Sequence, residues 1–242
     1  MERSLNASAV DCIFMQISRL YAIYTHYFCI NMQFTAYNAS SVYQVYYAED
    51  YEGYIGAAWT ATVGRYSVSM DNGYAYSYYT KENNNDLLTS PSLNVATGVD
   101  YIMNFDLQLT PTNQNPSGFA IGANSTNVYK NHTSKNANAN AALLLEQQAA
   151  STGTWLINGS TTQSVSLTAG TWYTFTLKRI TEGGTVKMRL SIVQRDDSDA
   201  TPAFEEADIT TLNETGGLGC IQHYTQKSYA TMGIDNIVVY TK

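Results

Sequence analysis

Charged side chains are scarce in this sequence. Asp, Glu, Lys and Arg make up 14% of its 242 residues, against about a quarter in an average globular protein. Acidic residues outnumber basic ones by 20 to 13, which gives a net charge of −7. Such a chain repels a phosphate backbone, and it contains no basic stripe interleaved with aromatic residues. Nucleic acids are therefore excluded as an expected partner.

Cysteine and histidine are also scarce, with three of each. Cys12, Cys29 and Cys220 show no CxxC spacing, which argues against a disulfide framework and against a zinc site. Cys12 and Cys29 could pair, whereas Cys220 is expected to be a free, buried thiol. The histidines lie far apart and form no HExxH motif, so metal catalysis has no support. No cofactor is expected to be required.

No run of about twenty nearly uncharged apolar residues follows residue 33, so no helical membrane span is expected. The segment before it differs from the rest of the chain. Apolar residues at helical spacing between Ile13 and Phe28 predict a short amphipathic helix. A secretory signal is the alternative, although Asp11 and Arg19 interrupt its apolar region, and a start codon assigned too early is a third. We treat residues 1–41 as an appendage and residues 42–242 as one folded domain.

From Val42 onward, apolar and polar residues alternate with a period of two. The clearest examples are DYIMNFDLQLT (100–110), TWYTFTLKRI (171–180) and TVKMRLSIVQR (185–195). This pattern predicts antiparallel strands with one wet face. Turn signals such as Asn158-Gly159 and Gly183-Gly184 separate the runs. The sequence therefore predicts an all-β protein, a two-sheet antiparallel β-sandwich of the jelly-roll type.

Several segments in this order resemble the concanavalin A-like, laminin-G-type jelly rolls. The most diagnostic are the GTWY strand that opens at Gly170 and the closing segment GIDNIVVY, and the similarity covers about residues 45–241. The nearest resemblance is to non-catalytic modules of secreted bacterial polysaccharide-degrading proteins. It implies an extracellular or cell-surface protein that binds a polysaccharide or glycan as part of a larger secreted or surface assembly.

The catalytic branches of this superfamily match less well. Retaining β-glucanases of this fold carry Glu-x-Asp-x-x-Glu or Glu-x-Asp-x-Glu on one strand, with two carboxyl groups roughly 5 Å apart. The acidic runs EDYE (49–52) and EEAD (205–208) lack that spacing. Alginate-lyase-like relatives use Gln-x-His, whereas Gln222 and His223 are adjacent and would point to opposite faces of a strand. Catalysis is therefore disfavoured, and a lyase, a hydrolase or a structural adhesion domain is the alternative function.

A structural calcium ion is the one metal that the resemblance suggests. Modules of this kind often join their first and last strands through a hard-cation site of carboxylates and carbonyls. Glu52 and Asp235 would supply the charges here. The reading that we favour is that Asp235 only accepts hydrogen bonds from a neighbouring loop.

Aromatic residues decide where a sugar would bind, because sugar C–H faces pack on Trp and Tyr rings. Tyr74, Tyr76 and Tyr78 share one face of a strand. Since Ala75 and Ser77 are too small to cover a core, the tyrosine face is expected to be the one packed against the core. Trp59 and Trp172 are also expected to be packed in the core. The predicted binding residues are instead exposed aromatics and amides near the loops. They are Trp155, Tyr129, Asn83, Asn84 and Asn85, with Tyr78 at the edge of the sheet.

Overall fold

The chain forms an antiparallel β-sandwich within one compact unit, Ser40–Lys242. The computed structural model describes residues 43–49, 59–61, 66–69, 74–79, 86–111, 117–123, 128–131, 134–137, 140–149, 152–197, 199–213, 216–225 and 231–242. These residues contain strands and turns but no helix. The predicted all-β fold is therefore confirmed. The appendage expected at residues 1–41 lies outside the described ranges.

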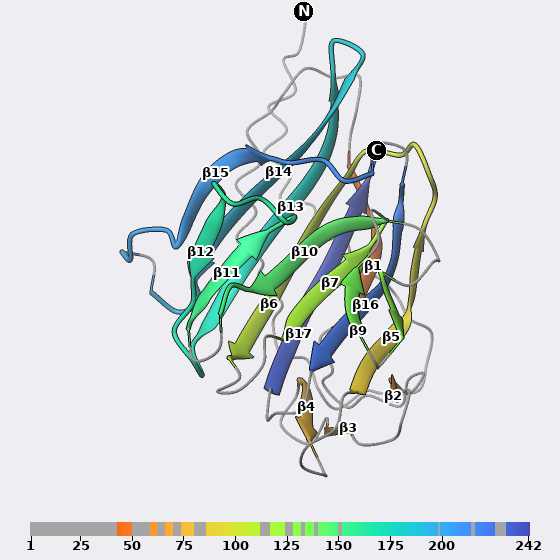
Figure 1. Cartoon of the computed structure of the whole chain (residues 1–242). Coiled ribbons are helices and arrows are strands. Elements are labelled where there is room, and N and C mark those ends of the chain that lie inside the picture. Colours follow the sequence, from red (N-terminus) through yellow and green to blue (C-terminus); the bar gives the residue numbers. More distant parts are fainter. Residues whose placement is uncertain are drawn as a thin grey trace, which may run out of the picture. The chain divides into compact units, whose positions relative to one another are not determined.

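Two large sheets make up the sandwich (Figure 1). Sheet A contains, in spatial order, β15 (Phe204–Ile209), β14 (Thr185–Gln194), β13 (Trp172–Glu182), β6 (Tyr101–Thr110), β17 (Thr231–Thr241), β4 (Ala75–Tyr79) and β3 (Tyr66–Ser69), and β1 (Gln44–Glu49) also pairs with β17. Sheet B contains β12 (Ser164–Ser166), β11 (Thr154–Ile157), β10 (Ala141–Gln147), β7 (Gly118–Gly122), β16 (Leu218–Thr225), β5 (Asp86–Val95) and β2 (Thr60–Ala61). A separate pair joins β8 (Tyr129–Asn131) to β9 (Ser134–Ala137).

Strand β6 shows how the alternating sequence produces two different faces. Its odd-numbered residues are buried between the sheets, as the sequence predicts: Tyr101, Met103, Phe105, Leu107 and Leu109. The even-numbered residues lie on the outer face of sheet A. Strands β13 and β14 follow the same rule, so three adjacent strands present one apolar and one polar face.

Tight turns set the register of the hairpins. Asn158 and Gly159 have φ angles of 49° and 70°, and Gly183 and Gly184 have φ angles of 58° and 81°. Two successive residues with positive φ form the turn that matches the twist of two-residue hairpins. Both turn predictions are confirmed: Gly183-Gly184 forms the whole loop between β13 and β14, and Asn158-Gly159 forms the turn that begins the longer connection from β11 to β12.

Aromatic rings bridge the two sheets at the centre of the main core. Phe105 of sheet A stacks on Phe175 of the neighbouring strand at 5.0 Å and on Phe119 of sheet B at 6.0 Å. Trp155 belongs to this core and has 0% of its surface exposed. The exposure predicted for Trp155 is therefore wrong. Because Trp155 and Ile157 alternate with outward residues on β11, both point between the sheets, whatever turns flank them.

A second apolar cluster covers the opposite, outer face of sheet B. It contains Leu87, Ala120, Val128, Tyr129, Ala141, Leu144 and Tyr224, with Leu212 packed against it. Tyr129 stacks on Tyr224 with ring centroids 5.2 Å apart, and its hydroxyl lies over Gly118, where any Cβ would collide. The Tyr129 amide donates to Gln222 Oε1 at 3.0 Å. The exposure predicted for Tyr129 is also wrong, because a glycine in the strand below makes room for its ring.

Gln222 and His223 point to opposite faces of β16, as predicted from their adjacency. Gln222 pairs with Thr89 and Ala120 on the outer side, whereas His223 pairs with Leu88 and Phe119 of the main core. Cys220, on the same strand, is a buried thiol that takes part in no disulfide, as expected. Burial lowers the pKa of His223 to about 3, because the charged imidazolium loses its hydration.

Replacing Trp155 with Ala should destabilise the fold strongly. Removing a buried indole leaves a cavity between the sheets and costs about 3–5 kcal/mol in such positions. Denaturant unfolding of Trp155→Ala should show this loss, while Val45→Ala on exposed β1 should unfold almost like the parent protein. A loss below about 1 kcal/mol for Trp155→Ala would contradict the buried position.

The buried His223 should make the protein sensitive to acid. The folded imidazole binds its proton near pH 3 and the unfolded one near 6.5, so His223 contributes its stability in full above pH 6.5. That contribution should fall by about 1.4 kcal/mol for each pH unit as the pH drops toward 3. Denaturant unfolding between pH 7.5 and 4 would measure the slope. His223→Gln should lack this part of the slope; an equal slope in both proteins would refute the assignment.

Candidate functional site

Tyr74, just before β4, and Tyr76, within it, face outward from the sandwich. Ala75 has no exposed surface and packs in the main core, whereas Tyr74 and Tyr76 are half-buried on the other side. The prediction that the tyrosine face is the packed one is therefore wrong. The small Ala75 suffices on the inner side because bulky residues of the adjacent β17, Met232 and Ile234, fill the core there.

Strand register places these tyrosines beside residues far away in sequence. Gly233 of β17 lies between Tyr76 of β4 and Gln108 of β6, and Gln108 lies next to Trp172 of β13. These four residues form one line across the outer face of sheet A. A Cβ at Gly233 would approach Trp172 Cη2 to 2.7 Å, so the indole ring reaches across Gln108 and rests on the glycine.

Three aromatic rings meet along this line, and we call Tyr74, Tyr76 and Trp172 the aromatic cluster. The Tyr74 ring meets Trp172 edge-on with centroids 5.0 Å apart, and it meets Tyr76 edge-on at 6.1 Å. All three side chains are half-buried. Trp172, expected to be packed in the core, lies on the outer face, while Trp59 is buried as predicted. The cluster therefore presents aromatic surface to solvent on a face of sheet A that no other described strand covers.

A polar network borders the aromatic cluster along the next row of the sheet. Asp106 and Asp235 are only 6% and 8% exposed. Thr174 Oγ1 donates to Asp106 Oδ1 at 2.6 Å. Arg195 Nη1 donates to Oδ2 of both carboxylates, at 3.3 Å each. The Arg195 guanidinium also lies 5.1 Å from the centroid of Trp172, within the range of a cation–π contact.

Asn236 completes this network from a bulge in β17. Its φ is 49°, and the register with β6 shifts between Asp235 and Val238. The backbone N–H of Asn236 donates to Asp235 Oδ1 at 2.8 Å, and the side-chain Nδ2 of Asn236 donates to Asp106 Oδ2 at 2.8 Å. Burial raises the pKa of Asp235 above its ordinary value, although these donors and Arg195 oppose the shift. The bulge thus supplies two of the hydrogen bonds that hold both carboxylates.

Asp235 accepts hydrogen bonds from the protein, while calcium binding at this carboxylate stays a prediction. Its partners are Asn236 and Arg195. Across the described ranges, no group of three His, Cys, Asp or Glu side chains could hold a metal ion. Glu52 lies outside those ranges, so its part in a cation site with Asp235 stays a prediction.

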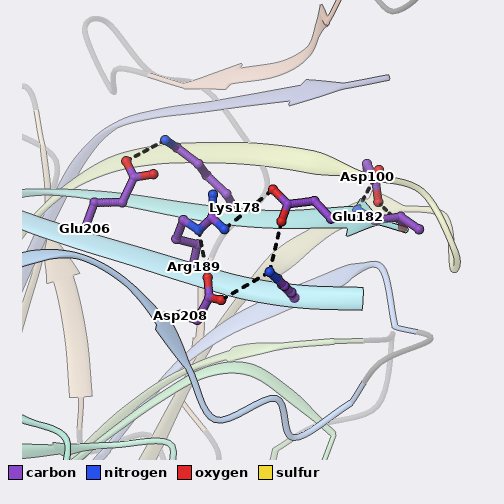
Figure 2. Close-up of polar contacts among 8 residues, drawn as sticks. Asp100, Lys178, Glu182, Arg189, Glu206 and Asp208 are labelled. Atoms are coloured by element: carbon purple, nitrogen blue, oxygen red, sulfur yellow. Dashed lines mark hydrogen bonds and ion pairs between the residues drawn. The ribbon is translucent and has the colours of Figure 1, made fainter. Parts of the chain in front are cut away.

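A ladder of charged side chains lies on the same outer face, over β13, β14 and β15 (Figure 2). Lys178 Nζ lies 2.6 Å from Glu206 Oε2. Arg189 lies between Asp208 at 2.7 Å and Glu182 at 3.5 Å, and Lys187 contacts the same two carboxylates. The hydrogen bond from Arg189 lowers the pKa of Asp208. Such exposed pairs add little stability, but they leave no unpaired charge among these six side chains.

The predicted binding residues do not come together in the described structure. Trp155 and Tyr129 lie in two different buried clusters, and neither offers a ring face to solvent. Tyr78 lies in β4, two residues after Tyr76. Asn83, Asn84 and Asn85 lie outside the described residues. Sequence reasoning missed Arg195 and Asp106; the GTWY motif at Gly170 was the available signal for Trp172.

The network does not have the form of a catalytic carboxylate pair. Asp106 and Asp235 share one guanidinium and one asparagine, and their four oxygens all accept hydrogen bonds from the protein. A general acid and a nucleophile would need access to a sugar, and these carboxylates have little exposed surface. The arrangement is instead suited to holding Arg195 and Trp172 in place. No helix that could cross a membrane occurs in the described part of the chain.

Comparison with known proteins identifies the fold. No protein-family model matches the sequence, and no curated protein matches it. Among solved structures, the winged bean acidic lectin in complex with methyl-α-D-galactose has a TM-score of 0.53 at 11% identity, covering 83% of this chain and 99% of the lectin. The exoplasmic/lumenal domain of VIP36, in its Ca²⁺/Man3GlcNAc-bound form, has a TM-score of 0.52 at 7% identity, covering 83% of this chain and 90% of that domain.

A Bacillus subtilis protein of unknown function with a galectin-like fold is also similar. Its TM-score is 0.50 at 12% identity, and the alignment covers 83% of this chain and 100% of the Bacillus subtilis protein. Identities this low show the fold alone. The expected resemblance to concanavalin A-like jelly rolls is confirmed at that level: the chain has the β-sandwich architecture of the lectins.

Proposed function

We propose that this protein binds a glycan without catalysis, on the outer face of sheet A at the aromatic cluster. The observation that carries the proposal is the meeting of Trp172, Tyr74 and Tyr76 on an open face beside a fixed polar network. Sugar rings pack their C–H faces on aromatic side chains, and adjacent polar groups then bind the hydroxyls.

Arg195 and Gln108 are the polar groups best placed to bind hydroxyls. Arg195 is 30% exposed, and its Nη2 makes no hydrogen bond to a described residue. Gln108 lies between Gly233 and Trp172 in the line across the sheet, and its Nε2 donates to the Gly170 carbonyl, which fixes the amide. Both side chains are held before a ligand arrives, which reduces the entropy lost on binding.

The outer face of sheet B is less suited to this role. Tyr129, Tyr224 and their apolar neighbours are fully buried there, so the described part of that face offers no aromatic surface. Lectin-like neighbours with bound sugars support glycan binding at the level of the fold. An extracellular or surface location within a larger assembly, and a contribution from Asn83–Asn85, belong to the same proposal.

A lyase or hydrolase would show product release on a polysaccharide panel, and a structural domain would bind no glycan. A glycan array on the full chain separates the structural alternative from the proposal, and a product-release assay on the polysaccharide panel separates the catalytic one. We expect binding to at least one glycan and no release of sugar from it.

Trp172→Ala should weaken binding while leaving the fold intact. Loss of one stacking aromatic should cost at least about 1 kcal/mol, or about fivefold in affinity. Calorimetry with a glycan identified on the array would measure the affinity, and a thermal melt would report the fold. Val45→Ala, on an exposed strand away from the cluster, is the matched control. Unchanged affinity in both Trp172→Ala and Tyr76→Ala would refute the assigned face.

Gly233→Ala tests the position of the indole without removing any binding group. The added Cβ would lie 2.7 Å from Trp172 Cη2, so the ring must move off the sheet. We expect lower affinity, a shifted tryptophan emission spectrum and a melting temperature close to that of the parent. A shifted emission with unchanged affinity would show that the resting place of Trp172 on Gly233 is not needed for binding.

A further inference from the structure

Arg195, which lies beside the aromatic cluster, is paired with three carboxylates. Its Nη1 lies 3.3 Å from Asp106 Oδ2 and 3.3 Å from Asp235 Oδ2. Its Nε lies 3.4 Å from Oδ2 of Asp196, a side chain that is 81% exposed. One positive charge therefore meets three negative ones. The polar border of the cluster is net negative, although an arginine stands at its centre.

This geometry also limits how Arg195 could bind an anion. A bidentate grip on a carboxylate or sulfate uses two adjacent nitrogens of the guanidinium, either Nη1 with Nη2 or Nε with Nη2. Nη1 contacts Asp106 and Asp235, and Nε contacts Asp196. Each nitrogen pair that could grip an anion therefore already has one nitrogen occupied by an aspartate of the protein. The N–H groups of Nη2 can still donate to the oxygen of a neutral hydroxyl.

The charge ladder on the same face does not offset the negative border. Lys178, Lys187 and Arg189 pair with Glu182, Glu206 and Asp208, so the six charges sum to zero. A chain that extends from the cluster across β13 and β14 therefore meets no excess of positive charge. Together with the net charge of −7 for the whole sequence, the described charges of this face are expected to repel anions.

We propose, on the basis of the proposed function, that the ligand is an uncharged polysaccharide and that Asp106, Asp196 and Asp235 around Arg195 exclude uronate-rich and sulfated chains. A neutral sugar stacks on Trp172 and donates or accepts hydrogen bonds without a charge cost. An acidic sugar in the same position brings a like charge close to three carboxylates, and that repulsion weakens its binding.

The test compares matched pairs of polysaccharides that differ only in charge. The probes are methyl-esterified pectin with polygalacturonic acid, and dextran or laminarin with its sulfated form. Affinity electrophoresis and calorimetry on the full chain are done at 20 mM and 300 mM NaCl. For any backbone that binds, the neutral member should bind at least fivefold more tightly at low salt. The difference should shrink at high salt, because salt screens exposed charges.

Asp196→Asn is the diagnostic variant, because it removes one exposed carboxylate from Arg195 and leaves the buried pair intact. The variant should reduce the ratio of the affinity for the neutral member to the affinity for the acidic member at least twofold. Asp199→Asn is the matched control, since it makes the same charge change nearby without an ion pair to Arg195. An equal effect of both variants would show a general charge effect and overturn the role of Asp196.

Tighter binding of an acidic member would overturn the inference while the proposed function stands. Absence of binding to every probe, together with an empty glycan array, would contradict the proposed function and the inference with it.

Discussion

The stacking of Phe105 on Phe119 and Phe175 fixes which side of β6 and of β13 faces the core and which faces outward. These rings join the two sheets at the centre of the core. Because the side-chain period of a strand is two, burying Phe105 and Phe175 forces Asp106 and Thr174 outward. Antiparallel register with β17 then brings Asp235 beside Asp106. The polar network is thus a consequence of the aromatic core on the other side of the same backbone.

The fold could be predicted from the sequence because its evidence is local. Alternation within 100–110, 171–180 and 185–195 identifies strands, and Asn-Gly or Gly-Gly turns identify hairpins without knowledge of distant partners. The arrangement of the candidate site could not be predicted in this way. An alternating run defines two faces but does not say which one another sheet covers. The small Ala75 therefore predicts the wrong face for Tyr74 and Tyr76, because the core on its side is filled partly by Ile234 of a distant strand.

Distant partners also explain the errors at Trp155 and Tyr129. Trp155 lies two residues after Gly153 and three residues before the Asn158-Gly159 turn, but its exposure depends on the phase of β11 relative to β10 and β12. Tyr129 is buried because Gly118 leaves space for its hydroxyl and Tyr224 provides a stacking surface. Arg195 gave no local signal at all. Its partners Asp106 and Asp235 are 89 and 40 positions away, and only sheet register connects them.

The bulge at Asn236 affects which sequence changes the outer face of sheet A can tolerate during evolution. On one side of the bulge, β17 pairs with β4 through Met232–Ile234; on the other side, it pairs with β1 through Ile237–Thr241. One strand therefore has two different neighbours along the same edge. A residue inserted in β1, or a change in its register, should not shift the pairing of β4 with β17, because the extra residue at the bulge interrupts the ladder of hydrogen bonds between the two segments. The chain near β1 can thus change in length or sequence without disturbing the pairing of Tyr76 with Gly233.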